Sequence, residues 1–389
     1  MSVPPTRAAL ERAIRDGELV LHYQPKICLT SGQVRGAEAL VRWNDGADVV
    51  APDDFLPLAE RSGLLHQITL DLLDQVVAAA VSLRASRVPL ALSMNVAPDD
   101  LAANVISGRI GERLAAGDIV PAELEIEITE SAVMGNVDKV RDDLERLRAL
   151  GIKVLMDDFG TGYSSIDRLS QLPFESLKLD QGVVRRMGTS RRNLDVVKAS
   201  ISMARELRMT AIAEGVESAG AYDFLVAHGC EEAQGFWIAR PMSLDELRGF
   251  VAGEHDFSGS QIGRVHHAIL DLLHFRKCLV DALYCSRGGA VTALDSVTDP
   301  GLGGDVADSR VGAWYFGSGR HLERHPSYRA IEAPLARVHA DGNRLLDRLS
   351  GGGQGGGSGP RLADIDAQVG HLVALMHELE RELIVAHQG

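Results

Sequence analysis

Two adjacent aspartates, Asp157 and Asp158, directly follow the apolar run 152–156, which is typical of a buried strand. Successive side chains of a strand point to opposite faces, and a buried carboxylate without a partner has a steep desolvation cost. We therefore expect one aspartate to face a pocket and the other a neighbouring loop, or both to bind cations. The two glycines and small hydroxyls of residues 159–165 favour a loop with unusual backbone angles. Since an Asp-Asp pair before such a segment is most often only a turn, a functional interpretation requires matching acids from other strands.

Matching acids and amides occur near the ends of other predicted strands. The predicted strand 124–129 alternates acids with aliphatic residues, and this period places Glu123, Glu125 and Glu127 on one face. Inward carboxylates need partners, and all-oxygen ligand sets suit Mg²⁺ or Mn²⁺ rather than zinc or copper. Two such ions sharing an aspartate would hold a phosphodiester, activate water and offset charge on the leaving oxygen. The residues that we expect at one rim are Glu38, Asn95, Glu127, Asp157, Asp158, Lys178, Glu214, Glu217 and Gln234.

The elements that position these residues alternate regularly up to about residue 253. Helical spacing is clear at Ile68, Val76 and Leu83 and again over 193–207, and the segment 243–246 has the pattern of a capping box. Eight strands separated by helices indicate a (β/α)8 barrel, in which chemistry gathers at the C-terminal ends of the strands. The predicted strands are Leu19–Gln24, Val34–Trp43, Leu90–Val96, Leu124–Thr129, Lys153–Asp157, Ser176–Asp180, Thr210–Ala213 and Ala233–Ile238.

The alternation stops around residues 254–260, and we place the domain boundary there, between 1–255 and 256–389. Beyond it three helical patterns predict a helical bundle, with a flexible glycine-rich loop at 350–360. The last pattern is typical of a helix that dimerises, although a helical bundle within one chain uses the same kind of apolar stripe. That stripe consists of Leu362, Ile365, Val369, Leu372, Met376, Leu379 and Leu383.

Length and composition exclude several classes of protein. A chain of 389 residues exceeds one typical domain, and its formal net charge, 40 − 54 = −14, argues against binding a nucleic-acid polymer. The four cysteines form no CxxC pair and no disulfide framework, which favours a reducing compartment. Charged residues interrupt the N-terminus, and no apolar run is long enough to span a membrane. We therefore expect a cytoplasmic protein.

A series of ordered motifs runs through residues 10–250: Tyr23-Gln24-Pro25, Glu38-Ala39-Leu40, Asn95, Glu127-Ile128-Thr129-Glu130, Asp157-Asp158-Phe159-Gly160-Thr161-Gly162, Lys178-Leu179-Asp180, Ala213-Glu214-Gly215-Val216-Glu217, Gln234-Gly235-Phe236 and Arg240-Pro241. Through these motifs, residues 10–250 resemble the EAL family of cyclic di-GMP phosphodiesterases. This family has a modified (β/α)8 barrel, in which the first strand runs against the others, and it hydrolyses cyclic di-GMP to linear pGpG. The resemblance therefore implies a phosphodiesterase with two Mg²⁺ or Mn²⁺ ions.

The resemblance also implies roles for the metal-site residues. Asp157 would bridge the two ions, and Asp158 would hold the second. Lys178 would orient or polarise the attacking water, and Glu214 resembles the general base or a residue linked to the metals. The ligands of the first ion would be Glu38, Asn95, Glu127 and Asp157, with Glu217 and Gln234 as further partners at the metal site.

Other positions match the family's substrate-binding and loop residues. Arg42 would contact a substrate phosphate through its guanidinium fork, and Gln24 and Asp180 would help to hold the nucleotide. Glu130 would keep the loop 157–165 ordered. None of these positions is substituted, but Gln181-Gly182, after the lysine motif, departs from the commoner pattern, which bears at most on substrate fit.

The alternative function is a non-catalytic receptor, which would bind cyclic di-GMP and signal through the helical half. Such members usually lose metal ligands or the loop glutamate, and this sequence has lost none, which favours the enzyme. No GG[DE]EF motif occurs, so synthesis of the nucleotide is not expected.

The helical half contains a second set of motifs: Gly312-Ala313-Trp314-Tyr315, Pro326-Ser327-Tyr328, Pro334-Leu335-Ala336-Arg337-Val338-His339 and His274-Phe275-Arg276. Through them, residues 262–387 resemble the chemoreceptor zinc-binding (CZB-type) domain, which binds zinc through three histidines and one cysteine. Here His274 and His339 stand at two ligand positions, but Ser309 and Leu335 occupy the others. The simpler interpretation is that zinc binding is lost and that the bundle regulates the barrel or dimerises. The alternative is a rearranged site that uses Cys278, four residues after His274, or one of the other histidines.

Overall fold

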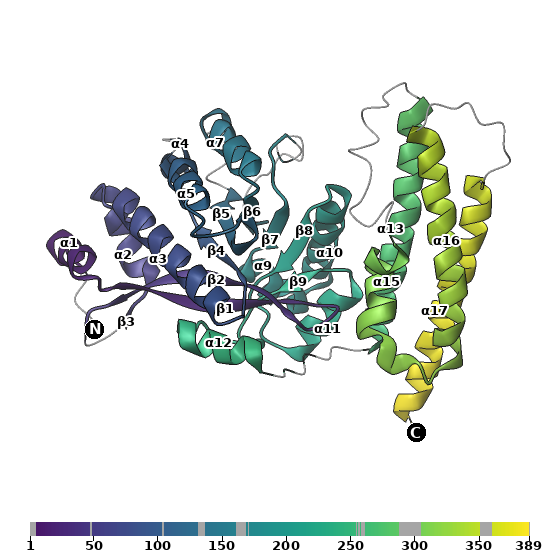
Figure 1. Cartoon of the computed structure of the whole chain (residues 1–389). Coiled ribbons are helices and arrows are strands. Elements are labelled where there is room, and N and C mark those ends of the chain that lie inside the picture. The colour runs from purple at the N-terminus through teal and green to yellow at the C-terminus, as the bar shows by residue number, and fades with distance from the viewer. Residues whose placement is uncertain are drawn as a thin grey trace. The chain divides into compact units, whose positions relative to one another are not determined.

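The computed structural model divides the chain into two compact units. One comprises residues 1–28, 32–221 and 231–257, and the other comprises residues 29–31, 222–230 and 258–389. Strands and helices build the first unit, and long helices build the second (Figure 1). The residues that the structure describes are 5–46, 49–102, 105–130, 137–160, 169, 171–253, 255, 257, 261–287, 305–350 and 360–388.

Eight strands of the first unit close into a barrel in the order β1-β9-β8-β7-β6-β5-β4-β2, because β2 also pairs with β1. Strand β1 runs antiparallel to both of its neighbours, whereas the other neighbouring pairs of the ring are parallel. The short β3 (Val49–Val50) pairs with β2 outside the ring. This arrangement confirms the predicted modified (β/α)8 barrel. The ring consists of β1 (Leu19–Cys28), β2 (Val34–Asn44), β4 (Ala91–Asn95), β5 (Leu124–Thr129), β6 (Lys153–Phe159), β7 (Ser176–Leu179), β8 (Thr210–Ala213) and β9 (Glu232–Ala233).

Amphipathic helices surround the strands (Figure 1). The predicted apolar face of α3 is buried, and the capping box of Ser243 and Glu246 begins α12 as predicted. Helix α10 covers most of the predicted range 193–207, and in it Val197 and Ile201 are buried, whereas Val196 is 43% exposed. The helices of this unit are α1 (Arg7–Asp16), α2 (Pro52–Arg61), α3 (Leu65–Ala85), α4 (Pro98–Ala102), α5 (Val105–Ala115), α7 (Val137–Ala149), α9 (Gln181–Arg186), α10 (Arg191–Glu206) and α12 (Leu244–Ala252). Helix α11 (Ala219–Ala227) spans the division, with residues 222–227 in the second unit.

Three predicted strand details are wrong. Strand β1 continues past Gln24 to Cys28, since Pro25 lies within its pairing to β2. The last strand ends at Ala233, because Gly235 turns the chain with a φ of 158° and accepts hydrogen bonds from the next turn. Glu123 precedes β5 in a 3₁₀ turn and pairs with Arg84 at 2.7 Å, so it does not share the inward face of Glu127.

The second unit is a bundle of three long helices, as predicted. The stripe of α17 is buried within the unit, at 0–2% exposure from Ile365 to Leu383, so intrachain packing already uses it. Helix α16 begins at Pro326 and contains Pro334. Most of the predicted glycine-rich loop, 351–359, and most of the predicted boundary, 254–260, lie outside the described residues. The long helices are α13 (Gln261–Arg287), α16 (Pro326–Ser350) and α17 (Leu362–Gln388), with the short α15 (Arg310–Ala313) between the first two.

No helix in the described ranges has both the length and the apolar character needed to cross a membrane.

Candidate metal centre

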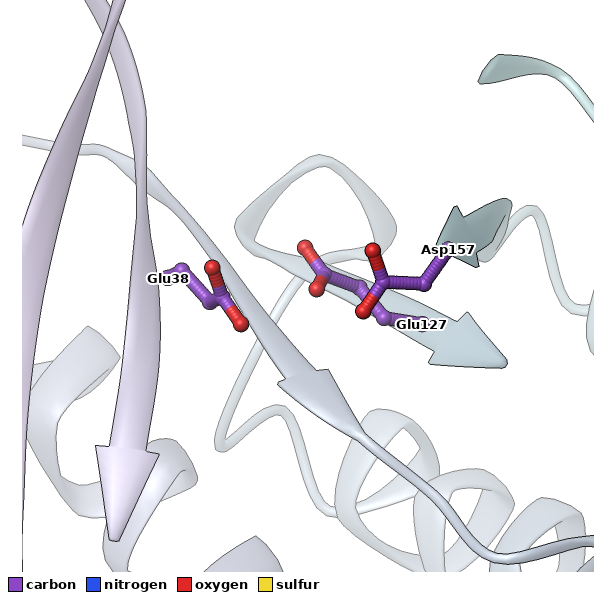
Figure 2. Close-up of side chains that lie close together, drawn as sticks. All are labelled: Glu38, Glu127 and Asp157. Atoms are coloured by element: carbon purple, nitrogen blue, oxygen red, sulfur yellow. The ribbon is translucent and has the colours of Figure 1, made fainter. Parts of the chain in front are cut away.

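Three buried carboxylates meet inside the barrel. Glu38 comes from β2, Glu127 from β5 and Asp157 from β6, and their side chains point toward one another (Figure 2). One oxygen of each lies within 4.8 Å of the others. Among the residues described, this is the only group of three or more histidine, cysteine or acidic side chains close enough to hold one metal ion.

Strand register explains why residues far apart in sequence converge. Asn95 of β4 pairs with Glu127 of β5, and Glu127 pairs with Leu155 of β6. Asp157 lies two residues beyond Leu155, so it shares the inward face of that strand. Gln24 of β1 pairs with Glu38 of β2 in the antiparallel hairpin. The barrel therefore delivers polar side chains from neighbouring strands to one level of its interior.

Lys178 of β7 lies at the centre of the cluster. Its Nζ is 2.5 Å from Glu127 Oε2, 2.6 Å from Glu214 Oε1 and 3.3 Å from Asp157 Oδ1. Glu38 Oε2 is 3.4 Å away. The lysine side chain is fully buried. Four carboxylates thus surround a single ammonium group, which leaves an excess of negative charge if all of them ionise.

The pKa values reflect this excess. Burial would lower the pKa of Lys178, but Glu127 and Glu214 raise it well above its usual value. Burial and the nearby Glu38 raise the pKa of Glu127 to about 7. Burial and Asp157 raise the pKa of Glu214 to about 8. Burial would also raise the pKa of Glu38, but Lys178 outweighs it and lowers that pKa. The cluster must therefore hold protons or other cations.

Amide side chains orient Glu38. Asn95 Nδ2 donates to Glu38 Oε1 at 2.9 Å, and Gln234 Nε2 donates to Glu38 Oε2 at 2.7 Å. The same Gln234 nitrogen lies 3.0 Å from Gln24 Oε1, and Gln24 Nε2 donates to the Ala239 carbonyl at 3.0 Å. Both oxygens of Glu38 are thus held in place, as a metal ligand requires.

The donor set fits a hard divalent cation. Glu127 Oε1 is buried and has no hydrogen-bond partner, although the Lys26 ammonium lies 3.9 Å away. A buried carboxylate oxygen without a hydrogen bond favours a bound cation or a proton. Gln234 Oε1 is likewise buried without a partner. Carboxylate and amide oxygens are the ligands that Mg²⁺ and Mn²⁺ prefer. A metal ion would therefore be held by Glu38, Glu127 and Asp157, with Asn95 beside them.

Asp157 and Asp158 diverge because the pairing of β6 with β7 shifts between Met156 and Phe159. Asp158 adopts a left-handed conformation with a φ of 57°, and its N–H donates to Asp157 Oδ1 at 2.9 Å. Burial and the charge of Asp157 raise the pKa of Asp158. Such an irregularity re-aims side chains at a strand end. Asp158 is not a member of the three-carboxylate group, but it adjoins the same cavity.

Three other predicted residues have partners outside the three-carboxylate group. Glu217 is 46% exposed and pairs with Arg185 at 2.6 Å. Asp180 caps α9 by accepting the Val183 N–H. Arg42 donates to the Val41 carbonyl at 2.8 Å; burial lowers its pKa, while Glu38 opposes that shift. Their roles in binding metal or substrate remain predictions.

Glu130 contacts the beginning of the loop that follows Asp158. Its Oε2 accepts the Gly160 N–H at 3.1 Å, and the carboxylate is almost completely buried. The remainder of the predicted loop, 161–165, lies outside the described residues.

Lys26 is a site neighbour that the sequence analysis missed. It is buried, its Nζ is 2.6 Å from Glu125 Oε2 and 3.1 Å from Ser93 Oγ, and it lies 3.9 Å from Glu127 Oε1. The sequence did contain a signal for Lys26, because it lies two residues after Gln24 and the two side chains therefore share one face of β1. Because the predicted strand ended at Gln24, before Pro25, Lys26 was not placed on that strand.

A cavity of about 550 Å³ opens beside the carboxylates. Asn95, Asp157 and Asp158 belong to its lining, and so do apolar and acidic side chains from β2, α2 and α3. A small ligand in this cavity would therefore contact the metal-binding residues directly.

Known proteins share this barrel. The sequence model of the EAL domain family matches residues 7–241. The cyclic di-GMP phosphodiesterase NbdA of Pseudomonas aeruginosa is 36% identical over 244 residues, covering 62% of this chain and 31% of NbdA. RocR, a cyclic di-GMP phosphodiesterase of the same species, is 34% identical over 250 residues, covering 64% of each chain. A solved structure of the PaMucR phosphodiesterase with c-di-GMP superposes with a TM-score of 0.59 at 34% identity, covering 62% of this chain and 98% of that one.

We predict that Mn²⁺ stabilises the barrel and that Glu127→Gln removes most of this effect. A ligand present at about 100 times its Kd stabilises a folded protein by about 2.7 kcal/mol. The variant keeps the shape of the side chain but loses an anionic donor, so its Mn²⁺ affinity should fall by at least about tenfold. Calorimetric titration and thermal unfolding with Mn²⁺ measure both quantities.

The matched control is Glu145→Gln on α7, where the glutamate is exposed and distant in sequence from the cluster. Wild-type Mn²⁺ affinity in Glu127→Gln, or an equal loss in the control, would contradict the metal centre.

Proposed function

The chain belongs to the EAL domain family, and on that premise we propose that it is a metal-dependent phosphodiesterase that hydrolyses cyclic di-GMP to linear pGpG. The match to each of the first curated relatives covers less than two thirds of that relative's length, from 29% to 64%. The proposal therefore concerns the barrel, and any wider activity would depend on other segments of such proteins.

The observation that carries this proposal is the convergence of Glu38, Glu127 and Asp157 around Lys178 beside an open cavity. The buried Lys26, by contrast, has one carboxylate within hydrogen-bond distance, Glu125 at 2.6 Å, and Glu127 lies farther away at 3.9 Å. Around Lys178 the carboxylates outnumber the lysine, and one buried oxygen has no hydrogen-bond partner. Excess oxygen donors of this kind suit divalent cations and a phosphate substrate.

The chain's own residues supply binding, orientation and proton transfer. We assign one ion to Glu38, Asn95, Glu127 and Asp157, and a second to Asp158 with Asp157 shared. When bound, two Mg²⁺ or Mn²⁺ ions would lower the pKa of water and offset charge on the leaving oxygen. Lys178 would orient the attacking water, and Glu214, whose Oε1 is 2.6 Å from Lys178, would accept its proton. Arg42, Gln24 and Asp180 would hold the nucleotide at the edge of the barrel.

We further propose that the helical unit regulates the barrel and is a CZB-like domain that no longer binds zinc. His274 Nε2 lies 3.6 Å from Cys278 Sγ, and His339 stacks on Phe275. Ser309 caps α15, with its hydroxyl accepting the Gly312 N–H at 3.0 Å, so that side chain already has a structural role. A homodimer remains part of the proposal, but the stripe of α17 no longer supports it, because that stripe is buried within the chain.

Glu38→Ala is expected to abolish cleavage. The variant loses a metal ligand together with the hydrogen bonds that Asn95 and Gln234 make to it. Removing an outer partner of a metal site lowers activity by about 10- to 100-fold, and we expect the cleavage rate of Glu38→Ala to fall by roughly another order of magnitude. Chromatography of pGpG formed from cyclic di-GMP with Mg²⁺ or Mn²⁺ measures the rate, with Glu145→Ala as control. A near-normal rate in Glu38→Ala would remove the metal argument. Wild-type protein that binds the nucleotide but releases no pGpG would be a receptor.

Glu214→Gln should separate binding from chemistry. The glutamine keeps the side-chain volume but cannot accept the proton, so kcat should fall by about 10²- to 10⁴-fold while the Kd for cyclic di-GMP changes little. Single-turnover kinetics and equilibrium binding measure the two effects. Glu217→Gln, in the same segment but paired with Arg185, should lose less activity. Equal losses of binding and rate in Glu214→Gln would refute its assignment as a base.

For the helical unit we expect protein purified without a histidine tag to contain no stoichiometric zinc. The two histidines at ligand positions lack the third histidine and the cysteine of the CZB pattern, and a serine hydroxyl is a poor zinc ligand. Elemental analysis of the full chain, and of His274→Ala, gives the answer. One zinc per chain that disappears in His274→Ala would overturn the proposal and favour the rearranged site with Cys278.

A further inference from the structure

A buried aspartate outside the metal centre joins two walls of the cavity. Asp100 of α4 is 3% exposed, and both of its carboxylate oxygens have partners on α3. Oδ1 lies 2.6 Å from His66 Nδ1, and Oδ2 accepts the Thr69 hydroxyl at 2.7 Å. Thr69 is itself buried and lines the cavity, whereas the His66 side chain is 47% exposed. We call Asp100, Thr69 and His66 the Asp100 clasp.

The two walls that the Asp100 clasp joins come from different elements. One wall is the beginning of α3, where Leu65, Ile68 and Thr69 face the cavity. The other is the connection from β4 to α4, where Asn95 and its next two residues face it. No metal-binding residue assigned above belongs to the clasp, yet the width of the cavity depends on how these two walls are held together.

The second wall is continuous with the metal centre. Asn95 donates to Glu38 at 2.9 Å, and the Val96 N–H donates to the Glu127 carbonyl at 2.9 Å. The Asp100 N–H donates to the Ala97 carbonyl at 3.1 Å, which joins α4 to this wall. A displacement of α4 would therefore shift the lining of the cavity first, whereas Glu38 has further support from Gln234.

The carboxylate of Asp100 also stabilises the N-terminal end of helix α3. Its N-cap, Leu64, provides no side-chain hydrogen bond, and its first turn contains no acidic residue. The positive end of a helix dipole favours a nearby anion, and here Asp100 supplies that charge from another element. Both the charge and the two hydrogen bonds thus fix the start of α3 against α4.

We propose that Asp100 and Thr69 are positioning residues that set the width of the substrate cavity and thereby determine nucleotide binding rather than the chemical step. This inference rests on the proposed function, because it takes the cavity beside the carboxylates as the binding site for cyclic di-GMP.

Thr69→Val and Thr69→Ser form a matched pair for the test. Valine keeps the shape of the side chain but leaves Asp100 Oδ2 unpaired in a buried place, whereas serine keeps the hydroxyl. For Thr69→Val we expect the KM for cyclic di-GMP to rise about tenfold, with kcat within about twofold of wild type. For Thr69→Ser, which keeps the hydroxyl, we expect a KM within about twofold of wild type.

Asp100→Asn gives a second route to the same effect, since it keeps the side-chain volume and loses the charge. The control is Asp99→Asn, which changes an exposed aspartate of the same helix and should leave KM unchanged. A fall in kcat with unchanged KM, wild-type behaviour of Thr69→Val, or a failure of Thr69→Ser to restore KM would overturn the proposal.

Hydrogen exchange of the nucleotide-free protein distinguishes failure of the clasp from failure of the proposed function. Thr69→Val should accelerate exchange of the Val96 and Asp100 amides and leave α10 unchanged. If wild-type protein neither binds nor cleaves cyclic di-GMP, the proposed function fails, and exchange alone decides whether the clasp holds the two walls. Unchanged exchange at these amides would refute the clasp whatever the enzyme assay gives.

Discussion

A single buried ammonium group surrounded by four carboxylates is the interaction on which the metal centre depends. Like charges in an interior of low dielectric repel strongly, and Lys178 offsets only one of them. Burial and the neighbouring carboxylates raise the pKa values of Glu127 and Glu214, which agrees with an excess of negative charge in the cluster. Such a cluster is unfavourable for stability, and it is therefore better explained by the binding of cations than by folding.

Comparison of the two buried lysines explains why one acidic group is a site and the other is not. Lys26 lies 3.1 Å from the Ser93 hydroxyl and 2.6 Å from the carboxylate of Glu125, with Glu127 more distant at 3.9 Å, so its charge is matched within the barrel. Lys178 has more anionic neighbours than it can neutralise, and Glu127 Oε1 has no hydrogen-bond partner, although the Lys26 ammonium lies 3.9 Å away. The same fold thus contains a neutral structural pair beside a cluster with excess negative charge, and only the latter adjoins the cavity.

The sequence predicted the barrel and the convergence of Glu38, Glu127 and Asp157 because both follow from periodicity and from the meeting of parallel strand ends. Periodicity could not predict the pairing shift around Asp158, since irregular pairing depends on the neighbouring strand. Lys26 was missed because the predicted strand ended before Pro25, whereas β1 continues through it. The stripe of α17 was also predicted, but periodicity alone does not determine whether a stripe packs within one chain or between two. The Asp100 clasp joins residues 31 or more positions apart, and such a contact has no local signal.

Anomalous diffraction from crystals grown with Mn²⁺ tests the metal centre most directly, since it locates the ions without requiring turnover. We expect a peak at roughly 2.0–2.3 Å from oxygens of Glu38, Glu127 and Asp157, with a second peak beside Asp158. Crystals in which these carboxylates contact only Lys178, with Mn²⁺ absent or bound elsewhere, would contradict a metal-dependent site in this barrel.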